Sequence, residues 1–302
     1  MERNVKIFIQ HETDELIPLS HHLTLEGNDI CTDQSKADLV ICEGNSMVHD
    51  DRFIYSHVKF PHAVLKALGL DIHFAQTNYF FTKWYDYKKG WGKQCFVGVP
   101  VYGLMDGCLS AQLPTVTCGR YVENDLSPGI FHSDVLQGFL NDLACRSFVS
   151  VEYSEDHEIT SISTGVPFNG LYNLLEGAKG SLGEFFLEPF KNRFIESWTT
   201  NLLVSRFPFP SASASDKITI HHVTPEIEKH LWFFDITRFR RSISTTSTKV
   251  ALVTAWGETL LESNRRALRT AFGLNVPLKQ FRLDAVRHAG SVFDSLGSVG
   301  VV

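Results

Sequence analysis

The sequence lacks a run of apolar residues that could cross a membrane, and it lacks cysteines spaced to hold a metal. A membrane helix takes about 20 consecutive apolar residues, and no segment of this 302-residue chain approaches that length. The six cysteines are scattered, with no Cys-x-x-Cys pair: Cys31, Cys42, Cys95, Cys108, Cys118 and Cys145. We therefore predict a cytoplasmic protein with reduced, packing cysteines and no membrane partner.

An excess of positive charge is also missing. The chain has 28 Lys and Arg against 34 Asp and Glu, a formal net charge of -6 and a pI near 6.1. Such a chain has no general attraction for nucleic acid or anionic membranes, although Arg238, Arg240 and Arg241 form a local basic run. A Gly-x-Ser-x-Gly nucleophile elbow and internal repeats are absent as well. The length suffices for two domains, or for one large α/β domain.

Strand and helix signals alternate in the first quarter of the chain. Residues 5–9 and 37–44 are apolar runs of strand length, the second closed by Gly44. Residues 61–70 read as a helix with proline in its first turn and glycine near its end. An extended pattern resumes at residues 71–74. This order predicts a small doubly wound domain over residues 1–75.

The next region combines aromatic residues with lysines. Strand-like segments at 94–99 and 115–118 predict an antiparallel sheet. The aromatic cluster holds Tyr79, Phe80, Phe81, Trp84, Tyr85, Tyr87 and Trp91, interleaved with Lys83, Lys88, Lys89 and Lys93. Stacked rings beside basic groups hold single-stranded nucleic acid in many proteins, so nucleic acid is not excluded as a partner. The alternative is that alternate aromatic side chains face a core while the lysines are solvated.

Helical spacing returns over residues 133–145, and residues 148–153 alternate as a half-buried strand does. Shorter helical segments follow at 172–176 and 181–190, then a strand at 199–204 and a loop at 211–215. Near the C-terminus, Val250–Val253 forms a β-branched strand signal, Gly257 permits a turn, and residues 260–272 place leucines, alanine and phenylalanine near one stripe.

This last unit, Lys249 to Phe272, resembles the C-terminal region of glycinamide ribonucleotide synthetase (phosphoribosylamine-glycine ligase), an ATP-grasp enzyme of purine synthesis. Weaker matches follow the family's order at the first short strand, Asp38–Ile41, the helix-strand unit Pro61–Phe74, Gly119–Gly129, Phe148–Ser163, Ser181–Phe185, Trp198–Pro208 and Phe281–Asp284. The resemblance implies an α/β fold: a small doubly wound N-terminal domain over 1–75, a reduced ATP-grasp-like α+β region over 76–195 and a C-terminal β/α domain over 196–302.

The resemblance also places a ligand site. In the family's substrate-facing loop, the matching positions here are Arg120, Asp125 and Pro128. An arginine can fork to a carboxylate or phosphate, and an aspartate can accept from an amine. The candidate ligand-binding residues are therefore Arg120, Asp125, Ser127, Pro128 and Gly129. The alternative is a surface loop in which Arg120 and Asp125 pair with each other.

Several departures from the family's motifs weaken the hypothesis that this chain is an active enzyme. Acidic residues replace the Gly-rich phosphate turn after the first strand, and carboxylates there would repel a phosphate. The magnesium-binding Glu and Asn of the family fall at Ser161 and Ser163, whose hydroxyls are poor substitutes. Glu152 or Glu158 could compensate through a register shift, although we expect both to face solvent. Only residues 76–118 lie where the family carries its ATP lobe; there Lys83 and Lys93 are the candidate nucleotide-binding residues.

One group of histidines suggests a metal. Glu226 and His230 are four residues apart, and His221 and His222 precede them. Thr224 and Pro225 read as the N-cap and first residue of a helix, so the two earlier histidines stand in an extended segment. Surface histidines and a folded metal site both remain open interpretations.

We therefore expect a non-catalytic or repurposed homologue that binds a ligand or a protein partner and needs no cofactor. The alternative is a divergent ATP-dependent carboxylate-amine ligase, which would use ATP and Mg²⁺ to activate a carboxylate as an acyl phosphate for attack by an amine.

Overall fold

The computed structural model describes residues 5–10, 16–42, 53–55, 58–103, 113–122, 127–187, 194, 197–210, 216–221, 223–240 and 242–298. The predicted loop at 211–215 lies outside these ranges, as do Cys108, Asp125, His222 and Arg241. None of the helices in these ranges has the length and apolar character needed to span a membrane. None of the five described cysteines forms a disulfide, and all but Cys31 are buried, as packing residues are expected to be.

The N-terminal part forms a four-stranded sheet in the order β2-β1-β3-β4, with every neighbouring pair parallel. Its strands are β1 (Lys6–Gln10), β2 (Asp29–Ile30), β3 (Leu39–Cys42) and β4 (Phe53–Tyr55), and helix α1 (Ile17–Leu25) connects the first two. Ile7 and Ile9 point into the core on the same side of β1, as alternation along a strand requires. The small α/β arrangement predicted for this region is confirmed.

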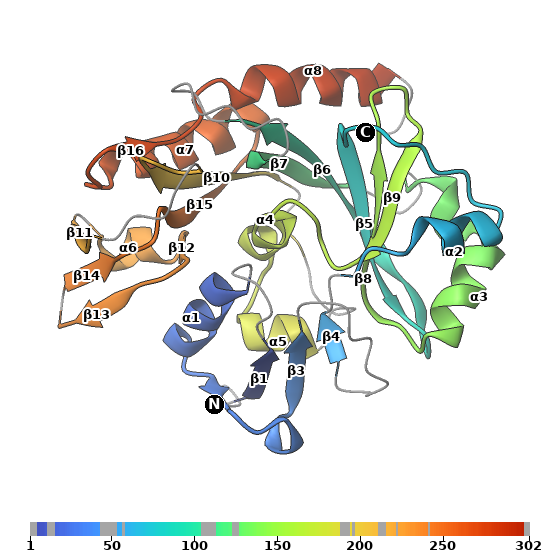
Figure 1. Cartoon of the computed structure of the whole chain (residues 1–302), viewed down its shortest axis with the longest axis horizontal. Coiled ribbons are helices and arrows are strands. Elements are labelled where there is room, and N and C mark those ends of the chain that lie inside the picture. Colours follow the sequence, from blue (N-terminus) through green and yellow to red (C-terminus); the bar gives the residue numbers. More distant parts are fainter. Residues whose placement is uncertain are drawn as a thin grey trace.

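One unit of that prediction was wrong. A helix does form as α2 (His62–Ala67), but residues 71–74 make no strand. The chain here runs instead along β9 (Ile159–Thr164): the N–H of Phe60 donates to the carbonyl of Ile162, and the N–H of His73 donates to that of Ile159. Figure 1 shows α2 beside α3 and far from β1 and β3. The parallel sheet takes its fourth strand from β4, a segment with no clear strand pattern.

A larger sheet follows in the order β12-β15-β10-β7-β6-β5-β8-β9, with β16 paired to β10. Its other strands are β5 (Tyr79–Asp86), β6 (Gly90–Tyr102), β7 (Pro114–Val122), β8 (Arg146–Tyr153), β10 (Trp198–Arg206), β12 (Leu231–Phe233), β15 (Lys249–Gly257) and β16 (Lys279–Gln280). All its pairs are antiparallel, as the strand signals around residues 94–99 and 115–118 predict. A separate small sheet combines β11 (Ile218–Ile220), β14 (Ser242–Thr245) and β13 (Thr237–Phe239).

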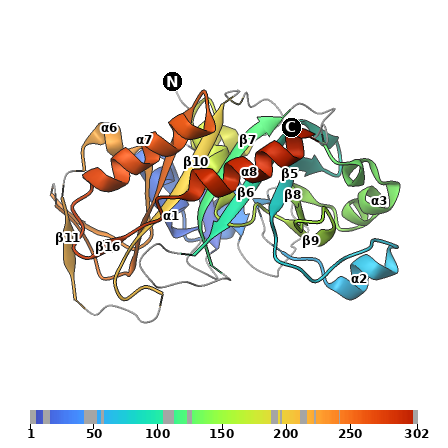
Figure 2. The same cartoon turned by 90° about the horizontal axis from the view of Figure 1, so that it is seen from above.

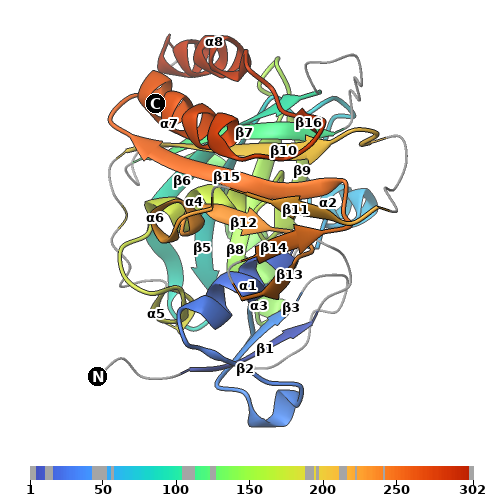
Figure 3. The same cartoon turned by 90° about the vertical axis from the view of Figure 1, so that its left-hand side faces the viewer.

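Helices cover both faces of the large sheet. Helices α7 (Leu260–Gly273) and α8 (Ala285–Ser298) lie across one face (Figure 2), with α3 (Asp134–Asp142) beyond them. Helices α4 (Gly170–Gly177) and α5 (Leu182–Leu187) and the parallel sheet lie on the opposite side (Figure 3). Leu202 and Val204 therefore pack in one core and Leu203 in the other. For the same reason β8 is buried on both faces, and the prediction of a half-buried strand there was wrong.

The β15–α7 junction is tightly built. Thr259 caps the helix by accepting from the N–H of Glu262, and the Glu262 carboxylate accepts from the N–H of Glu258. Gly257 is needed here for close approach, since a Cβ at this position would lie 2.6 Å from the backbone nitrogen of Ser263. The strand, turn and helix predicted at this end of the chain are confirmed.

Candidate functional site

The aromatic residues of β5 belong to the interior of the protein. Phe80 and Trp84 pack with the core on the α4 and α5 side, while Tyr79, Phe81 and Tyr85 pack in the opposite core. All five side chains are buried. They are therefore not available to stack on bases in this structure, and their alternation follows the two covered faces of the sheet.

Lys83 lies within this strand and is only 1% exposed. The expectation that the lysines of this region are all solvated was wrong for Lys83, because β5 is an internal strand of the sheet. Burial lowers the pKa of its ammonium group. A phosphate in solvent does not reach this side chain, whereas Lys93 is exposed on β6. A nucleotide-binding role for either lysine stays a prediction.

The predicted ligand residues lie at the end of β7 and beyond it: Arg120 is within the strand, whereas Ser127, Pro128 and Gly129 follow it. Arg120 is half-buried with its guanidinium 5.0 Å from the ring centroid of Trp198, and burial lowers its pKa. Ser127 Oγ lies 3.3 Å from His132 Nε2, and Pro128 precedes a short 3₁₀ turn that begins at Gly129. Asp125 lies outside the described residues, so its pairing with Arg120 stays a prediction.

The paired strands β8 and β9 place Glu152 opposite Ser161. Glu152 is 1% exposed, and the expectation that it faces solvent was wrong. Its Oε2 accepts from the Thr77 hydroxyl at 2.8 Å, and Lys59 Nζ lies 3.6 Å from Oε1. Ser163 is fully buried. Glu158, at the turn before β9, remains half-exposed, with one carboxylate oxygen 3.3 Å from His73 Nδ1.

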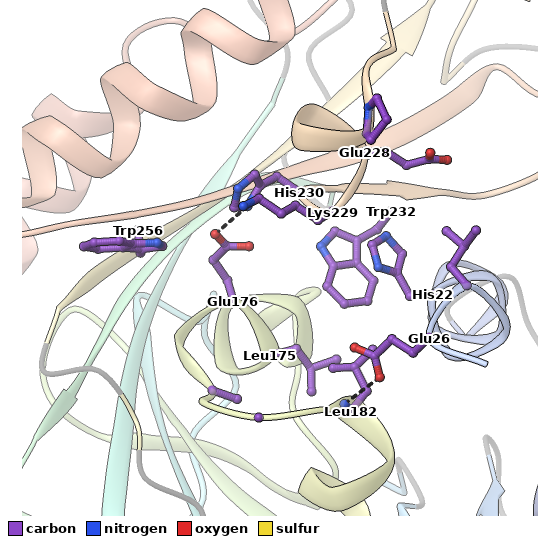
Figure 4. A pocket seen from close by; sticks show the side chains of 14 residues that line it. His22, Glu26, Leu175, Glu176, Leu182, Glu228, Lys229, His230, Trp232 and Trp256 are labelled. Atoms are coloured by element: carbon purple, nitrogen blue, oxygen red, sulfur yellow. Dashed lines mark hydrogen bonds and ion pairs between the residues drawn. The ribbon is translucent and has the colours of Figure 1, made fainter. Parts of the chain in front are cut away.

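A different region forms a cleft. We define the Glu176 cleft as two adjoining hollows that share the side chains of Glu176, His230 and Trp256. Strand β12 pairs with β15 only up to Val253, so the last residues of β15 lie at an open edge of the sheet. There α4 approaches from one face and α7 from the other, which creates the space. Figure 4 shows Trp256 on one side of the Glu176–His230 pair, with Trp232 and His22 on the other.

The centre of this cleft is a buried carboxylate. Glu176 lies in the last turn of α4, and its side chain is 4% exposed. Its Oε2 accepts from the Thr254 hydroxyl at 2.6 Å, and its Oε1 lies 2.8 Å from His230 Nδ1. Two lone pairs at that separation would repel each other, so Nδ1 carries the proton that faces the carboxylate, and Nε2 is the ring nitrogen turned away from Glu176.

His230 does not share a helix with Glu226, because α6 ends at Glu228 (α6, Pro225–Glu228). The predicted cap is confirmed: Thr224 accepts from the N–H of Ile227, with Pro225 as the first helical residue. Glu226 is exposed, His221 is exposed on the edge of the small sheet, and His222 is not described. Across the described part of the chain, no group of three or more His, Cys, Asp and Glu side chains is placed to hold a metal ion.

One wall of the cleft is formed by β12 and α1, which lie far apart in the sequence. The indole N–H of Trp232 donates to Thr254 Oγ1 at 3.0 Å, so this tryptophan belongs to the same network as Glu176. His22 of α1 stacks on the Trp232 ring at 3.9 Å, and its Nε2 donates to the carbonyl of Leu231 at 2.6 Å. Burial lowers the pKa of His22, which favours the neutral ring in this stack.

The other wall is cationic and comes from α7. Arg266 donates to the Glu262 carboxylate at 2.6 Å and to the carbonyl of Trp256 at 3.1 Å, and its guanidinium lies 4.8 Å from the Trp256 ring centroid. Arg269, one turn along the helix, is exposed. Within the described residues it has no ion pair or hydrogen bond from its side chain. None of the described loop candidates, Arg120 to Gly129, lines this cleft.

Sequence reasoning missed Glu176 and Trp256 as site residues. Glu176 is the one charged residue of the segment Gly170–Gly177, which is otherwise apolar or neutral and is buried. A lone acid in an apolar helix is a signal, because an unpaired buried carboxylate is costly. Trp256 stands within the strand-turn-helix unit that carries the family resemblance, where it reads as scaffold.

Comparison with known proteins gives the fold. No protein-family model and no curated protein matches the chain. Among solved structures, phosphoribosylamine-glycine ligase from Thermotoga maritima is similar at 12% identity and a TM-score of 0.58, with 92% of this chain and 99% of that chain covered. Urea carboxylase from Kluyveromyces lactis is similar at 8% identity and a TM-score of 0.53, over 90% of this chain and 30% of that chain.

The phosphoribosylaminoimidazole carboxylase ATPase subunit from Aquifex aeolicus is similar at 10% identity and a TM-score of 0.50, covering 90% of this chain and all of that chain. The chain therefore has the fold of the ATP-grasp ligases, as the resemblance in its sequence predicts. At these identities the likeness establishes the fold and leaves the reaction to the residues.

Proposed function

We propose that this protein keeps an ATP-grasp fold but binds a ligand without running the ligase reaction. The observation that carries the proposal is the environment of Glu152. Of the two acids that could take the place of the family's magnesium ligands, Glu152 on β8 is sealed inside the protein, and Glu158 lies at the turn before β9 with a carboxylate oxygen 3.3 Å from His73 Nδ1.

Magnesium demands octahedral oxygen coordination and usually keeps several waters, so it needs carboxylates that face an open space. Glu152 instead accepts from the Thr77 hydroxyl and faces the ammonium group of Lys59. Ser161 and Ser163, at the positions of the family's Glu and Asn, supply neutral hydroxyls. These residues do not fit a magnesium ion held against ATP phosphates.

The chain before α2 adds to this closure. The N–H of Val58 donates to Thr164 Oγ1 at 3.0 Å, and the N–H of Phe60 donates to the carbonyl of Ile162 at 2.9 Å. This segment covers the outer edge of β9, the last strand in the order of the large sheet. Access to the β8–β9 hairpin from that edge is blocked by backbone.

The Glu176 cleft supports the positive half of the proposal. It is a hollow beside a histidine whose orientation is fixed by a buried carboxylate, and pockets with a few converging polar groups are where small molecules bind. A divergent ATP-dependent carboxylate-amine ligase is the second candidate, favoured by the likeness to phosphoribosylamine-glycine ligase over 92% of this chain.

Titration calorimetry and a phosphate-release assay with ATP and Mg²⁺ separate the two candidates. We expect no Mg²⁺-dependent binding of ATP at millimolar concentration and no phosphate release, with or without glycine and phosphoribosylamine. Mg²⁺-dependent release of phosphate that Glu152→Gln abolishes, in a variant with the parent's melting temperature, would overturn the proposal and support the ligase.

A further inference from the structure

We propose that the Glu176 cleft binds an amphipathic organic anion, with a flat apolar body in one hollow and an anionic group at Arg269 in the other. This inference rests on the proposed function, since it specifies the ligand class and the site. It follows from how differently the two hollows are lined.

The larger hollow, of about 530 Å³, is mostly apolar. Its apolar lining consists of Leu25, Leu175, Ala178, Leu182, Pro225, Trp232 and Trp256. Its acids are already engaged: Glu26 accepts from the N–H of Leu182 at 2.8 Å, and Glu228 pairs with Arg238. Figure 4 shows the Glu26 carboxylate turned toward Leu182. This half therefore favours an apolar body, and its size is typical of small-molecule sites.

The smaller hollow, of about 410 Å³, is polar and is bordered by two arginines of α7. Arg266 is committed to Glu262 and to the carbonyl of Trp256. Arg269 is the cation of this hollow without a partner among the described residues. A free guanidinium presents a rigid fork of donors that suits a carboxylate, sulfonate or phosphate oxygen pair.

The side chains that the two hollows share lie where the middle of the ligand would bind. Since His230 Nδ1 faces Glu176, Nε2 is the ring nitrogen left to meet a ligand, and an imidazole nitrogen can accept a hydrogen bond from a ligand N–H or O–H. A ligand that carries an N–H or O–H between its apolar body and its anionic group matches this order. The indole of Trp256, held by Arg266, offers a flat surface for a ring.

The charge balance of the cleft also selects against polyphosphates. Beside the buried Glu176 carboxylate, the cleft has the free guanidinium of Arg269 in the smaller hollow and the exposed ammonium group of Lys229 at the larger one, and a triphosphate brings more negative charge than these two cations neutralise. The cleft therefore suits a monoanion or dianion.

The test uses two fluorescent probes that differ in one group. The dye 8-anilinonaphthalene-1-sulfonate has a flat apolar body, an N–H and a sulfonate, and N-phenyl-1-naphthylamine has the same body and N–H without the anion. We expect Arg269→Ala to weaken binding of the sulfonate about tenfold, because a charge-assisted hydrogen bond is lost, and to leave the neutral dye unchanged. Trp256→Leu should weaken both dyes.

The matched control is Arg265→Ala, which removes an exposed arginine of the same helix that does not line either hollow. It should leave both dyes unchanged. Equal effects of Arg265→Ala and Arg269→Ala on the sulfonate dye, or no effect of Arg269→Ala and Trp256→Leu in folded variants, would overturn the inference. That outcome is separable from failure of the proposed function, which is measured by Mg²⁺-dependent phosphate release in the same preparation.

Discussion

Two glutamates in this protein have nearly the same immediate surroundings, but only one of them borders a hollow. Glu152 and Glu176 are both buried; each accepts from a threonine hydroxyl, Thr77 at 2.8 Å and Thr254 at 2.6 Å. Each also faces a basic group, Lys59 at 3.6 Å or His230 at 2.8 Å. Glu152 lies within paired strands, whereas Glu176 borders two hollows.

The comparison teaches that burial and a partner do not by themselves make a site. The Glu152 carboxylate projects from a covered face of β8, where Thr77 and Lys59 lie against it and leave its side chain 1% exposed. A carboxylate at the end of a helix, at a sheet edge that β12 leaves open, has space on one side. Topology, rather than the identity of the contacts, makes the second one available.

The largest expected effect comes from breaking the scaffold of the cleft. Gly257→Val would place a Cβ 2.6 Å from the backbone nitrogen of Ser263, and α7 would have to shift away from β15. We expect a loss of about 3 kcal/mol of stability, at the upper end for overpacking, measured by urea denaturation.

The control for this prediction is Gly138→Ala in α3, where an added Cβ meets nothing within 4 Å. That change should stabilise the helix by up to about 1 kcal/mol. Equal melting temperatures for Gly257→Val and the parent protein would show that α7 does not approach β15 as described.

Substitution of Glu152 tests the closed half of the comparison. Glu152→Ala leaves the Thr77 hydroxyl without its acceptor and opens a cavity, so we expect a loss of about 2 kcal/mol. Glu152→Gln keeps an oxygen acceptor and should cost less than about 1 kcal/mol, because Lys59 is 59% exposed and an exposed ion pair contributes little. Denaturation midpoints measure both. If Glu152→Gln lowers the stability as much as Glu152→Ala does, the negative charge of Glu152 is itself needed. That result would contradict the description of this region as closed.

The sequence predicts more of the fold than of the site, for a physical reason. Helix α7 has a local cap, Thr259 with Glu262, and a periodic apolar stripe, so it is visible over fourteen residues. The parallel sheet is partly visible through the apolar β1 and β3. The pairing of residues 58–60 with β9, which replaces the predicted strand at 71–74, depends on contacts between segments about a hundred residues apart. No local pattern encodes such a pairing.

The site depends even more on distant contacts. Glu176, His230 and Trp256 come from a helix, a turn and a strand end, and each has an ordinary local reading. Helical spacing even suggested the wrong partner for His230, namely Glu226, because the helix stops two residues earlier at Glu228. Arg265 and Arg269 are both exposed arginines of α7, but only Arg269 lies on the side of the helix that meets the end of β15.

A pH titration tests how His22 contributes to the stability of the cleft wall. Burial holds the pKa of His22 below its ordinary value of 6.5, so the unfolded chain binds more protons than the folded one in mildly acidic solution. The stability from the neutral ring is fully present above about pH 6.5 and is lost as the pH falls through the folded pKa. His22→Phe keeps a ring on Trp232 but removes the bond to the Leu231 carbonyl, which should cost about 1 kcal/mol near neutral pH.

The result that tests His22 is the slope of melting temperature against pH, rather than the stability that the substitution loses. Melting temperature should fall less steeply with acidification in His22→Phe than in the parent. His21 and His288, whose pKa values burial also lowers, are present in both proteins and cancel in the difference. Parallel curves for the two proteins would show that His22 does not titrate as part of this wall.

The smallest expected effect concerns the loop that the family resemblance selects as a ligand site. Arg120 stands over the Trp198 ring at 5.0 Å, so Arg120→Ala should remove a cation–π contact and cost about 0.5 to 1 kcal/mol of stability. Because Arg120 does not line the Glu176 cleft, its removal should leave the affinity for 8-anilinonaphthalene-1-sulfonate unchanged, in contrast to Arg269→Ala. Fluorescence titration of the two variants side by side, with folding checked by circular dichroism, measures this contrast. A tenfold loss of dye affinity in Arg120→Ala with full affinity in Arg269→Ala would reverse the comparison, since the inherited loop would then hold the anion and the open edge at β15 would be scaffold.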